Sequence, residues 1–181
     1  MTKQWKVAES YGGLVTDRKA PFLRETSWNN DVGRQFLWDI ISTNIHVDEI
    51  QGFWAKSLNI SSPQWMILMA LSDLDRGQGV PVKDIATKLH VDRSFITVQS
   101  KLLENDGLVR RISSRNDARV VLLSLSAKAR KQISDLSAKQ ELLAKFIFAD
   151  LEAPALKDFL ERLALLKKKL EKAAIKLVAD I

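Results

Sequence analysis

Apolar side chains recur every three to four residues through most of this 181-residue chain, which is the spacing of one face of an amphipathic helix. The pattern predicts helices over residues 31–58, 63–75, 82–90, 93–105, 126–151 and 154–178. Two β-rich runs, residues 108–113 and 120–125, enclose a short polar segment and predict a β-hairpin. We therefore expect a mainly α fold with one small β-hairpin.

Residues with known capping preferences stand at several of these predicted helix ends. Asp31, Ser62, Asp92 and Ser126 precede helical patterns and are good N-cap residues. Gly107 follows the helix at 93–105, where a left-handed residue often ends a helix. These signals agree with the boundaries that the periodicity predicts.

The two short helices at 82–90 and 93–105 are joined by a turn of only about three residues, which is a helix-turn-helix signature. The hairpin follows at once, and its tip is rich in arginine. A helix-turn-helix followed by such a hairpin is a winged helix, whose second helix fits the major groove of duplex DNA.

Side chains on both parts of this unit are candidates for contact with DNA. We expect Ile96 and Leu103 on the buried side of helix 93–105, so the opposite face would meet base edges. That face carries Arg93, Ser94, Thr97, Val98 and Lys101. In the hairpin, Asp117 is expected to orient Arg119 toward a narrow minor groove. Arg115 lies beside them at the hairpin tip. Four further basic side chains are expected to bind phosphates: Arg110, Arg111, Lys83 and Lys88.

The basic charge of the chain is concentrated in this same region. The chain has 28 Lys and Arg against 22 Asp and Glu, a net charge of +6. Residues 76–131 hold twelve basic and five acidic side chains, a net of +7, which leaves 16 basic and 17 acidic elsewhere. The distribution favours an anionic partner such as nucleic acid. An ordinary solvated basic surface is the alternative.

Composition argues against most catalytic chemistry. The chain has no cysteine and two histidines, His46 and His90, which are too far apart for a motif-encoded metal site. No Ser-His-Asp set and no Gly-rich phosphate loop stand at recognisable spacing. The longest apolar run, Trp65–Leu71, is far short of the roughly 20 residues that span a bilayer. We expect a cytoplasmic protein that is not an enzyme and has no cofactor, metal or membrane partner.

Several segments together resemble the MarR family of bacterial regulators. They are Leu58–Trp65, Asp84–Leu89, Asp92–Ser94, Leu103–Arg110, Asp117–Arg119 and Leu125–Ser126. The resemblance covers about residues 32–178 and is most specific over 84–126. It implies a winged-helix homodimer that binds a palindromic operator, usually represses transcription and is often released by a small ligand. It also supports Asp117 and Arg119, which fall on the acidic and arginine positions of the family's wing.

The chain departs from the family pattern at some positions. Ala118 stands where a second arginine is common, and Pro81 where the third helix commonly opens with Ser or Thr. Gln99 and Ser100 occupy positions that are often apolar. We expect either looser packing of the recognition helix or a polar side chain that finds a hydrogen-bonding partner inside it.

Outside the winged helix, assigned to residues 61–125, three segments need another role. Residues 1–30 form an expected aromatic-containing arm, and the helices at 31–60 and 126–181 carry apolar stripes that a twofold partner would cover. An intrachain bundle is the alternative.

A ligand pocket is expected between the dimerisation region and the winged helix. Its candidate residues are Trp38, His46 and Trp65, with His46 or an arginine holding an anion such as an aromatic acid. Ordinary core or interface packing is the alternative reading of these aromatic residues.

Two other functions remain open at this point. The winged helix could serve as a protein interaction module whose basic surface meets an acidic partner, or as an architectural protein that binds any duplex.

Overall fold

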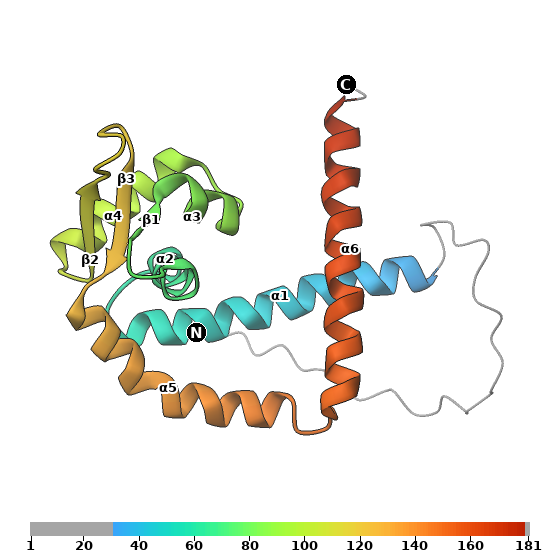
Figure 1. Cartoon of the computed structure of the whole chain (residues 1–181). Helices are drawn as coiled ribbons and strands as arrows, with labels where there is room; N and C mark the ends of the chain where they lie inside the picture. Colours follow the sequence, from blue (N-terminus) through green and yellow to red (C-terminus); the bar gives the residue numbers. More distant parts are fainter. Residues whose placement is uncertain (1–30, 180–181) are drawn as a thin grey trace, which may run out of the picture. The chain divides into compact units, whose positions relative to one another are not determined.

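The computed structural model describes residues 31–179, so the arm predicted for residues 1–30 lies outside the described part of the chain. The described chain contains these elements, in order (Figure 1): α1 Asp31–Ser57, α2 Ser62–Leu74, β1 Val80–Pro81, α3 Val82–Leu89, α4 Arg93–Asn105, β2 Val109–Ser113, β3 Val121–Leu125, α5 Ala127–Ile147 and α6 Ala153–Ala179. All six predicted helices and both hairpin strands are confirmed.

The strands form one antiparallel sheet in the order β1-β3-β2. Val109 pairs with Leu125 at one end of the hairpin, and Ser113 pairs with Val121 near its tip. Val80–Pro81 forms a third strand, because Val80 pairs with Leu123 on the edge of β3 that β2 leaves open. The winged helix therefore has a three-stranded sheet in place of a bare hairpin.

The main core lies where α2, α3, α4 and the sheet meet. Apolar side chains from each of these elements are fully buried, and burial of a side chain of this size stabilises the fold by about 1.5–3 kcal/mol. They include Trp65, Leu68, Leu71, Ile85, Ile96, Leu103 and Leu123. The core holds α4 firmly against the rest of the unit.

Leu102 is apolar but does not belong to the buried face of α4. Its side chain is 45% exposed, whereas Ile96 and Leu103 are completely buried. Ile96, Ser100 and Leu103 follow i, i+4, i+7 spacing on one helix face, and Leu102 lies about 100° away from Leu103 around the axis.

The capping of α2 also differs from expectation by one residue. Ser61 is the N-cap: the backbone N of Gln64 donates to its Oγ at 3.4 Å, and the backbone N of Ser61 donates to Gln64 Oε1 at 2.9 Å. This reciprocal pair is a capping box, and Ser62 opens the helix itself.

The predicted cap of α5 is confirmed, since the backbone N of Ala129 donates to Ser126 Oγ at 3.0 Å. Gly107 is confirmed as a left-handed residue with φ +71°.

The chain divides into two compact units, residues 1–50 and 51–181, and the boundary falls inside α1. In the first unit the described side chains are mostly exposed, including Val32, Trp38 and Ile45. In the second unit α6 buries none of its residues. No helix in the described range is both long and apolar enough to span a bilayer.

Candidate nucleic-acid interface

The turn between α3 and α4 depends on one left-handed residue. His90 ends α3 with φ +54° and ψ +44°, and the backbone N of Val91 donates back to the carbonyl of Ala86 at 3.1 Å. Asp92 is the N-cap residue of α4, although its side chain makes no capping hydrogen bond. The chain thereby reverses within three residues and presents the N-terminus of α4 beside α3.

The face of α4 opposite the core carries the predicted DNA contacts. Arg93, Ser94, Val98 and Lys101 are exposed, and Thr97 is half-buried with its hydroxyl donating to the carbonyl of Arg93 at 2.9 Å. Val98 is 56% exposed although it is a branched apolar residue on a helix surface. A side chain of this kind suits contact with a thymine methyl group in the major groove.

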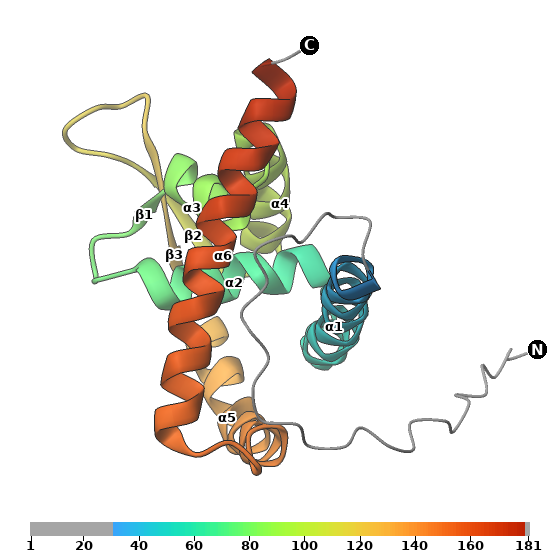
Figure 2. The ribbon, with the colours of Figure 1, turned by 90° about the vertical axis from the view of Figure 1, so that its right-hand side faces the viewer.

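The hairpin tip has a defined backbone although its side chains are exposed. The backbone N of Arg119 donates to Asp117 Oδ1 at 2.9 Å, and the backbone N of Val120 donates to the Asp117 carbonyl at 2.9 Å. Asp117 therefore fixes Arg119 through the main chain, and the two side chains form no ion pair in the part of the chain that the structure describes. In Figure 2 the loop projects beyond the sheet.

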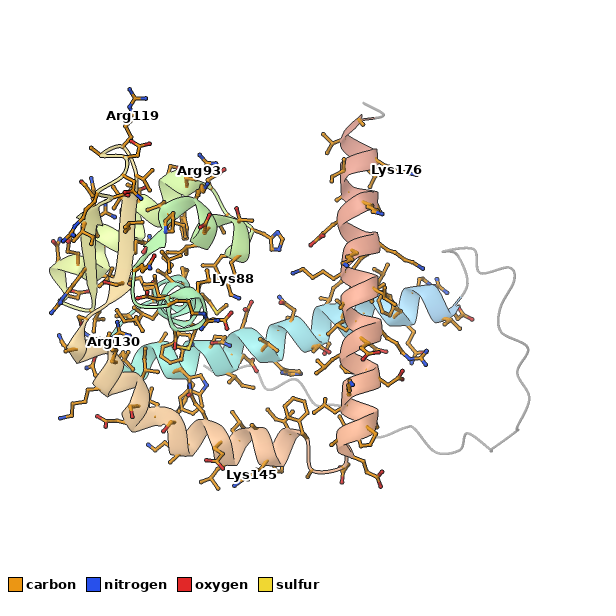
Figure 3. All side chains as sticks on the ribbon, in the orientation of Figure 1. Lys88, Arg93, Arg119, Arg130, Lys145 and Lys176 are labelled. Atoms are coloured by element: carbon orange, nitrogen blue, oxygen red, sulfur yellow. The ribbon has the colours of Figure 1, made fainter. Side chains whose placement is uncertain are left out.

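The tip of the hairpin and the start of α4 point the same way. Figure 3 shows Arg119 and Arg93 extending toward one end of the winged helix, whereas Arg130 at the start of α5 lies at the opposite end. Arg115 is also exposed at the tip. One face thus presents cationic side chains from both the helix and the wing.

Neighbouring arginines of β2 have different surroundings, because successive strand residues point to opposite faces. Arg110 is exposed, but the side chain of Arg111 is only 13% exposed. Arg111 Nε lies 3.4 Å from Glu104 Oε2, its Nη1 donates to Ser100 Oγ, and its backbone N donates to Glu104 Oε1 at 3.2 Å. Arg111 therefore joins the wing to α4, and little of its guanidinium is left to contact a phosphate as the sequence predicts.

The same contacts resolve the two alternatives for the polar positions of α4. Ser100 is completely buried, and its hydroxyl donates to the Thr97 carbonyl at 3.2 Å while accepting from Arg111. The second alternative is confirmed for Ser100, which is a satisfied polar side chain inside the interface between helix and wing.

Of the two lysines predicted on α3, one has an acidic partner. Lys88 donates to Asp73 Oδ2 at the end of α2, whereas Lys83 is exposed. The hydrogen bond from Lys88 and its positive charge hold the pKa of the Asp73 carboxyl below its ordinary value near 3.8. The pair ties α3 to α2 while Lys88 stays partly accessible to solvent.

A cavity of about 220 Å³ lies in the second unit, between the end of α1, α2 and α5. Trp65, one of the predicted pocket residues, lines it. Its other lining residues are Gln51, Trp54, Met69, Gln140, Leu143, Ala144, Ile147 and Phe148. The apolar spacing of these residues is the same as that of an ordinary helix face, so nothing in the sequence marks them as a pocket.

The other two predicted pocket residues do not line this cavity. Trp38 is 68% exposed on α1, and His46 Nδ1 lies 3.2 Å from Glu49 Oε2 on the same helix. Both belong to the first unit. Within residues 31–179 no three His, Asp or Glu side chains gather closely enough to hold a metal ion.

Comparison with known proteins agrees with this geometry. The sequence profile of the MarR family matches residues 60–121, from two residues before α2 to the first residue of β3. Over 120 residues the chain is 32% identical to the uncharacterized HTH-type transcriptional regulator YfiV of Bacillus subtilis (strain 168), covering 66% of this chain and 72% of that protein. The chain belongs to the MarR family.

Solved structures extend the likeness of this MarR-family chain to most of its length. The transcriptional regulator BldR from Sulfolobus solfataricus superposes with a TM-score of 0.63 at 24% identity, over 77% of this chain and 96% of BldR. MepR of S. aureus, solved as a complex with DNA, superposes with a TM-score of 0.61 at 16% identity, over 75% of this chain and 95% of MepR. These identities are low, so they show the winged-helix fold alone.

Membership of the family establishes the general role. This chain is a DNA-binding transcriptional regulator of the MarR family. That role agrees with the expectation that it is not an enzyme.

Proposed function

We propose that this MarR-family regulator binds a palindromic duplex operator as a homodimer, represses transcription there and leaves the DNA when a small molecule binds. The observation that carries the proposal is the common direction of the α4 face and the wing tip (Figure 3). The helix can enter the major groove while the wing lies over the adjacent minor groove only if both point toward the same side of the duplex.

Each part has its own task in this proposal. The exposed face of α4 reads base edges through Arg93, Ser94, Thr97, Val98 and Lys101. The wing places Arg119 in the minor groove, with Asp117 fixing its backbone and Arg115 beside it. Arg110, Lys83 and Lys88 bind phosphates, which set the position of the protein without reading sequence. Arg111 is left out because its guanidinium is used inside the protein.

The homodimer is supported by apolar surface that one chain leaves uncovered. In α6 the exposed side chains include Phe159, Leu160 and Leu163, and in α1 they include Trp38 and Ile41. Large apolar side chains left uncovered on a helix are characteristic of protein interfaces. A twofold partner would cover it and place two copies of α4 about 34 Å apart, one turn of duplex.

The effector response is supported by the cavity that Trp65 lines. The cavity is bounded by α2, which packs on α3 and α4, and by α5, which follows directly after the wing. A ligand between these helices could therefore change the position of the DNA-binding elements, provided that it binds the free and DNA-bound conformations with different affinity.

A footprint on a selected operator tests the DNA-binding part of the proposal. Operators are selected from random duplex with the full-length chain, and we expect protection with dyad symmetry and half-sites one helical turn apart. Protection without dyad symmetry contradicts a homodimer on a palindrome. Equal affinity for selected and unrelated duplexes at one salt concentration would indicate an architectural protein instead.

Two single substitutions separate base reading from a protein interaction role. Thr97→Ala is expected to relax the preference at major-groove positions, and Arg119→Ala at the flanking minor-groove positions. A protein interaction module would show neither change. Repression is checked with a reporter gene placed behind the selected operator, where loss of the regulator should raise transcription.

A further inference from the structure

We propose that Ser100, which lies on the buried face of α4, determines how well the wing reads DNA, because its hydroxyl holds Arg111 of β2 and so fixes the wing at a set distance from the recognition helix. Ser100 is a positioning residue in this proposal and touches no DNA itself. The inference rests on the proposed function, in which α4 and the wing read neighbouring grooves. Ser100 stands at a position that is often apolar in the MarR family, so the device belongs to this chain.

The contact between Ser100 and Arg111 is shielded from water. Ser100 is completely buried, and the side chain of Arg111 is only 13% exposed. Arg111 Nη1 donates to Ser100 Oγ, which donates in turn to the carbonyl of Thr97 at 3.2 Å. A hydrogen bond from a charged donor is stronger than one between neutral groups, and breaking it here leaves a largely buried guanidinium short of a partner. The contact therefore holds β2 against α4 before DNA is bound.

The guanidinium of Arg111 is held at two points on α4. Its Nε lies 3.4 Å from Glu104 Oε2, and Glu104 follows Ser100 by four residues, a rise of about 6 Å along the helix axis. Two contacts separated in this way restrain both the position and the tilt of β2 along α4. Without the Ser100 hydroxyl the Glu104 contact remains, and β2 can pivot about it.

The place of β2 in the sheet makes these contacts with α4 important. The strand order is β1-β3-β2, so β2 is an edge strand and pairs with β3 alone. The backbone N of Arg111 donates to Glu104 Oε1 at 3.2 Å, which adds a main-chain contact with α4. Three residues further on, the backbone N of Ser114 donates to the carbonyl of Val120 at 2.8 Å and closes the tip that carries Arg119. The tip therefore moves with β2, and a rotation at Arg111 displaces Arg119.

Substitution of Ser100 tests the inference through the bases that each element reads. The major-groove and wing positions of a selected operator are first identified as those at which Thr97→Ala and Arg119→Ala, respectively, relax the preference. Ser100→Ala is expected to lower the preference at the wing positions about fivefold, the equivalent of one hydrogen bond, and to change it at the major-groove positions by less than about twofold. A residue that only stabilises α4 would affect the positions that α4 reads.

Two further variants exclude a general loss of stability as the cause. Ile96→Val removes a methyl group from the buried face of α4, one turn before Ser100, and loosens the packing while Ser100 and Arg111 stay in place. It is expected to lower the melting temperature and to leave the wing preference unchanged. The double variant Ser100→Ala/Arg111→Ala is expected to lose no more wing preference than Arg111→Ala, because the two residues act through one contact. Circular dichroism checks that each variant is folded at the binding temperature.

A distance measurement without DNA follows the wing directly. The chain has no cysteine, so Asn105→Cys at the end of α4 and Asn116→Cys at the hairpin tip provide two unique sites for spin labels. Double electron–electron resonance on the full-length labelled chain, diluted with unlabelled chain, measures the distance between the two labels. Ser100→Ala is expected to broaden or shift the distance distribution, whereas Ile96→Val should leave it unchanged.

The results also distinguish this inference from the proposed function. Equal losses at both kinds of position in Ser100→Ala, a similar wing loss in Ile96→Val, a further loss in the double variant, or an unchanged distance distribution each overturn the inference. An unchanged wing preference in Ser100→Ala, where Arg119→Ala reduces it, overturns the inference and leaves the proposed function standing. If Arg119→Ala has no effect, the proposed minor-groove role of the wing is contradicted, and the distance distribution decides whether Ser100 holds the wing.

Discussion

The buried hydroxyl of Ser100 in α4 accepts a hydrogen bond from the guanidinium of Arg111 in β2. Arg111 also pairs with Glu104, one turn further along α4, through both its side chain and its backbone N. The recognition helix and the wing are therefore joined by a polar contact as well as by apolar packing. The direction of the wing relative to α4 depends on this contact.

Replacing Arg111 is expected to destabilise the fold more than replacing its exposed neighbour. Arg111→Ala leaves Ser100 and Glu104 without their shared partner, and the free energy of unfolding should fall by about 1–3 kcal/mol. Arg110→Ala removes an exposed side chain and should change stability by no more than about 0.5 kcal/mol. Urea unfolding followed by circular dichroism measures both, and equal losses would contradict the bracing role of Arg111.

The Asp117 side chain is expected to matter as a hydrogen-bond acceptor more than as a charge. Asp117→Ala removes the acceptor that the backbone N of Arg119 uses, so Arg119 becomes mobile and the preference for operator over unrelated duplex should fall several-fold, on the order of 1 kcal/mol. Asp117→Asn keeps an oxygen acceptor and should retain most of that preference. The affinity ratio at one salt concentration is the measurement, and a loss in both variants would assign the role to the charge.

The capping box at the start of α2 provides a stability test between adjacent serines. Ser61→Ala removes the acceptor for the backbone N of Gln64 and should lower the free energy of unfolding by about 1 kcal/mol. Ser62→Ala alters the first residue of the helix proper and should have little effect, because alanine is a good helix former. If Ser62→Ala proves the more damaging variant, Ser62 and not Ser61 acts as the cap.

The ion pair between Asp73 and Lys88 predicts a pH dependence with a definite sign. Lys88 lowers the pKa of Asp73 in the folded protein, so the folded state binds a proton at this site less readily than the unfolded state does. The stabilisation is present above the unfolded pKa and is lost as the pH falls through the folded one. In Lys88→Met the carboxyl pKa, followed by NMR titration, should return toward its ordinary value near 3.8. An unchanged pKa would show that Lys88 is not its cause.

Much of the fold could be predicted from local patterns. Helix periodicity, the hairpin and the left-handed Gly107 each depend on a few neighbouring residues, and the structure confirms all three. The third strand could not be predicted, because two residues give no alternation and the pairing of Val80 depends on a partner that is distant in sequence.

The candidate site was predictable in a similar way. The exposed face of α4 follows from the buried positions Ile96 and Leu103. The contact of Arg111 with Ser100 joins two elements, and no spacing rule links those positions. The cavity combines three helices, so Trp65 could be named from the sequence while Gln51 and Gln140 could not.

The pairing of β1 with β3 also limits how the protein can move. Val82, the first residue of α3, directly follows Pro81, the last residue of β1, so no flexible linker separates strand from helix. Because β1 is hydrogen-bonded to β3, the same strand that supports the wing, a movement of the wing would also displace α3. Wing and helix-turn-helix would then shift in concert, and a molecule that displaces one would disengage both from the double helix together.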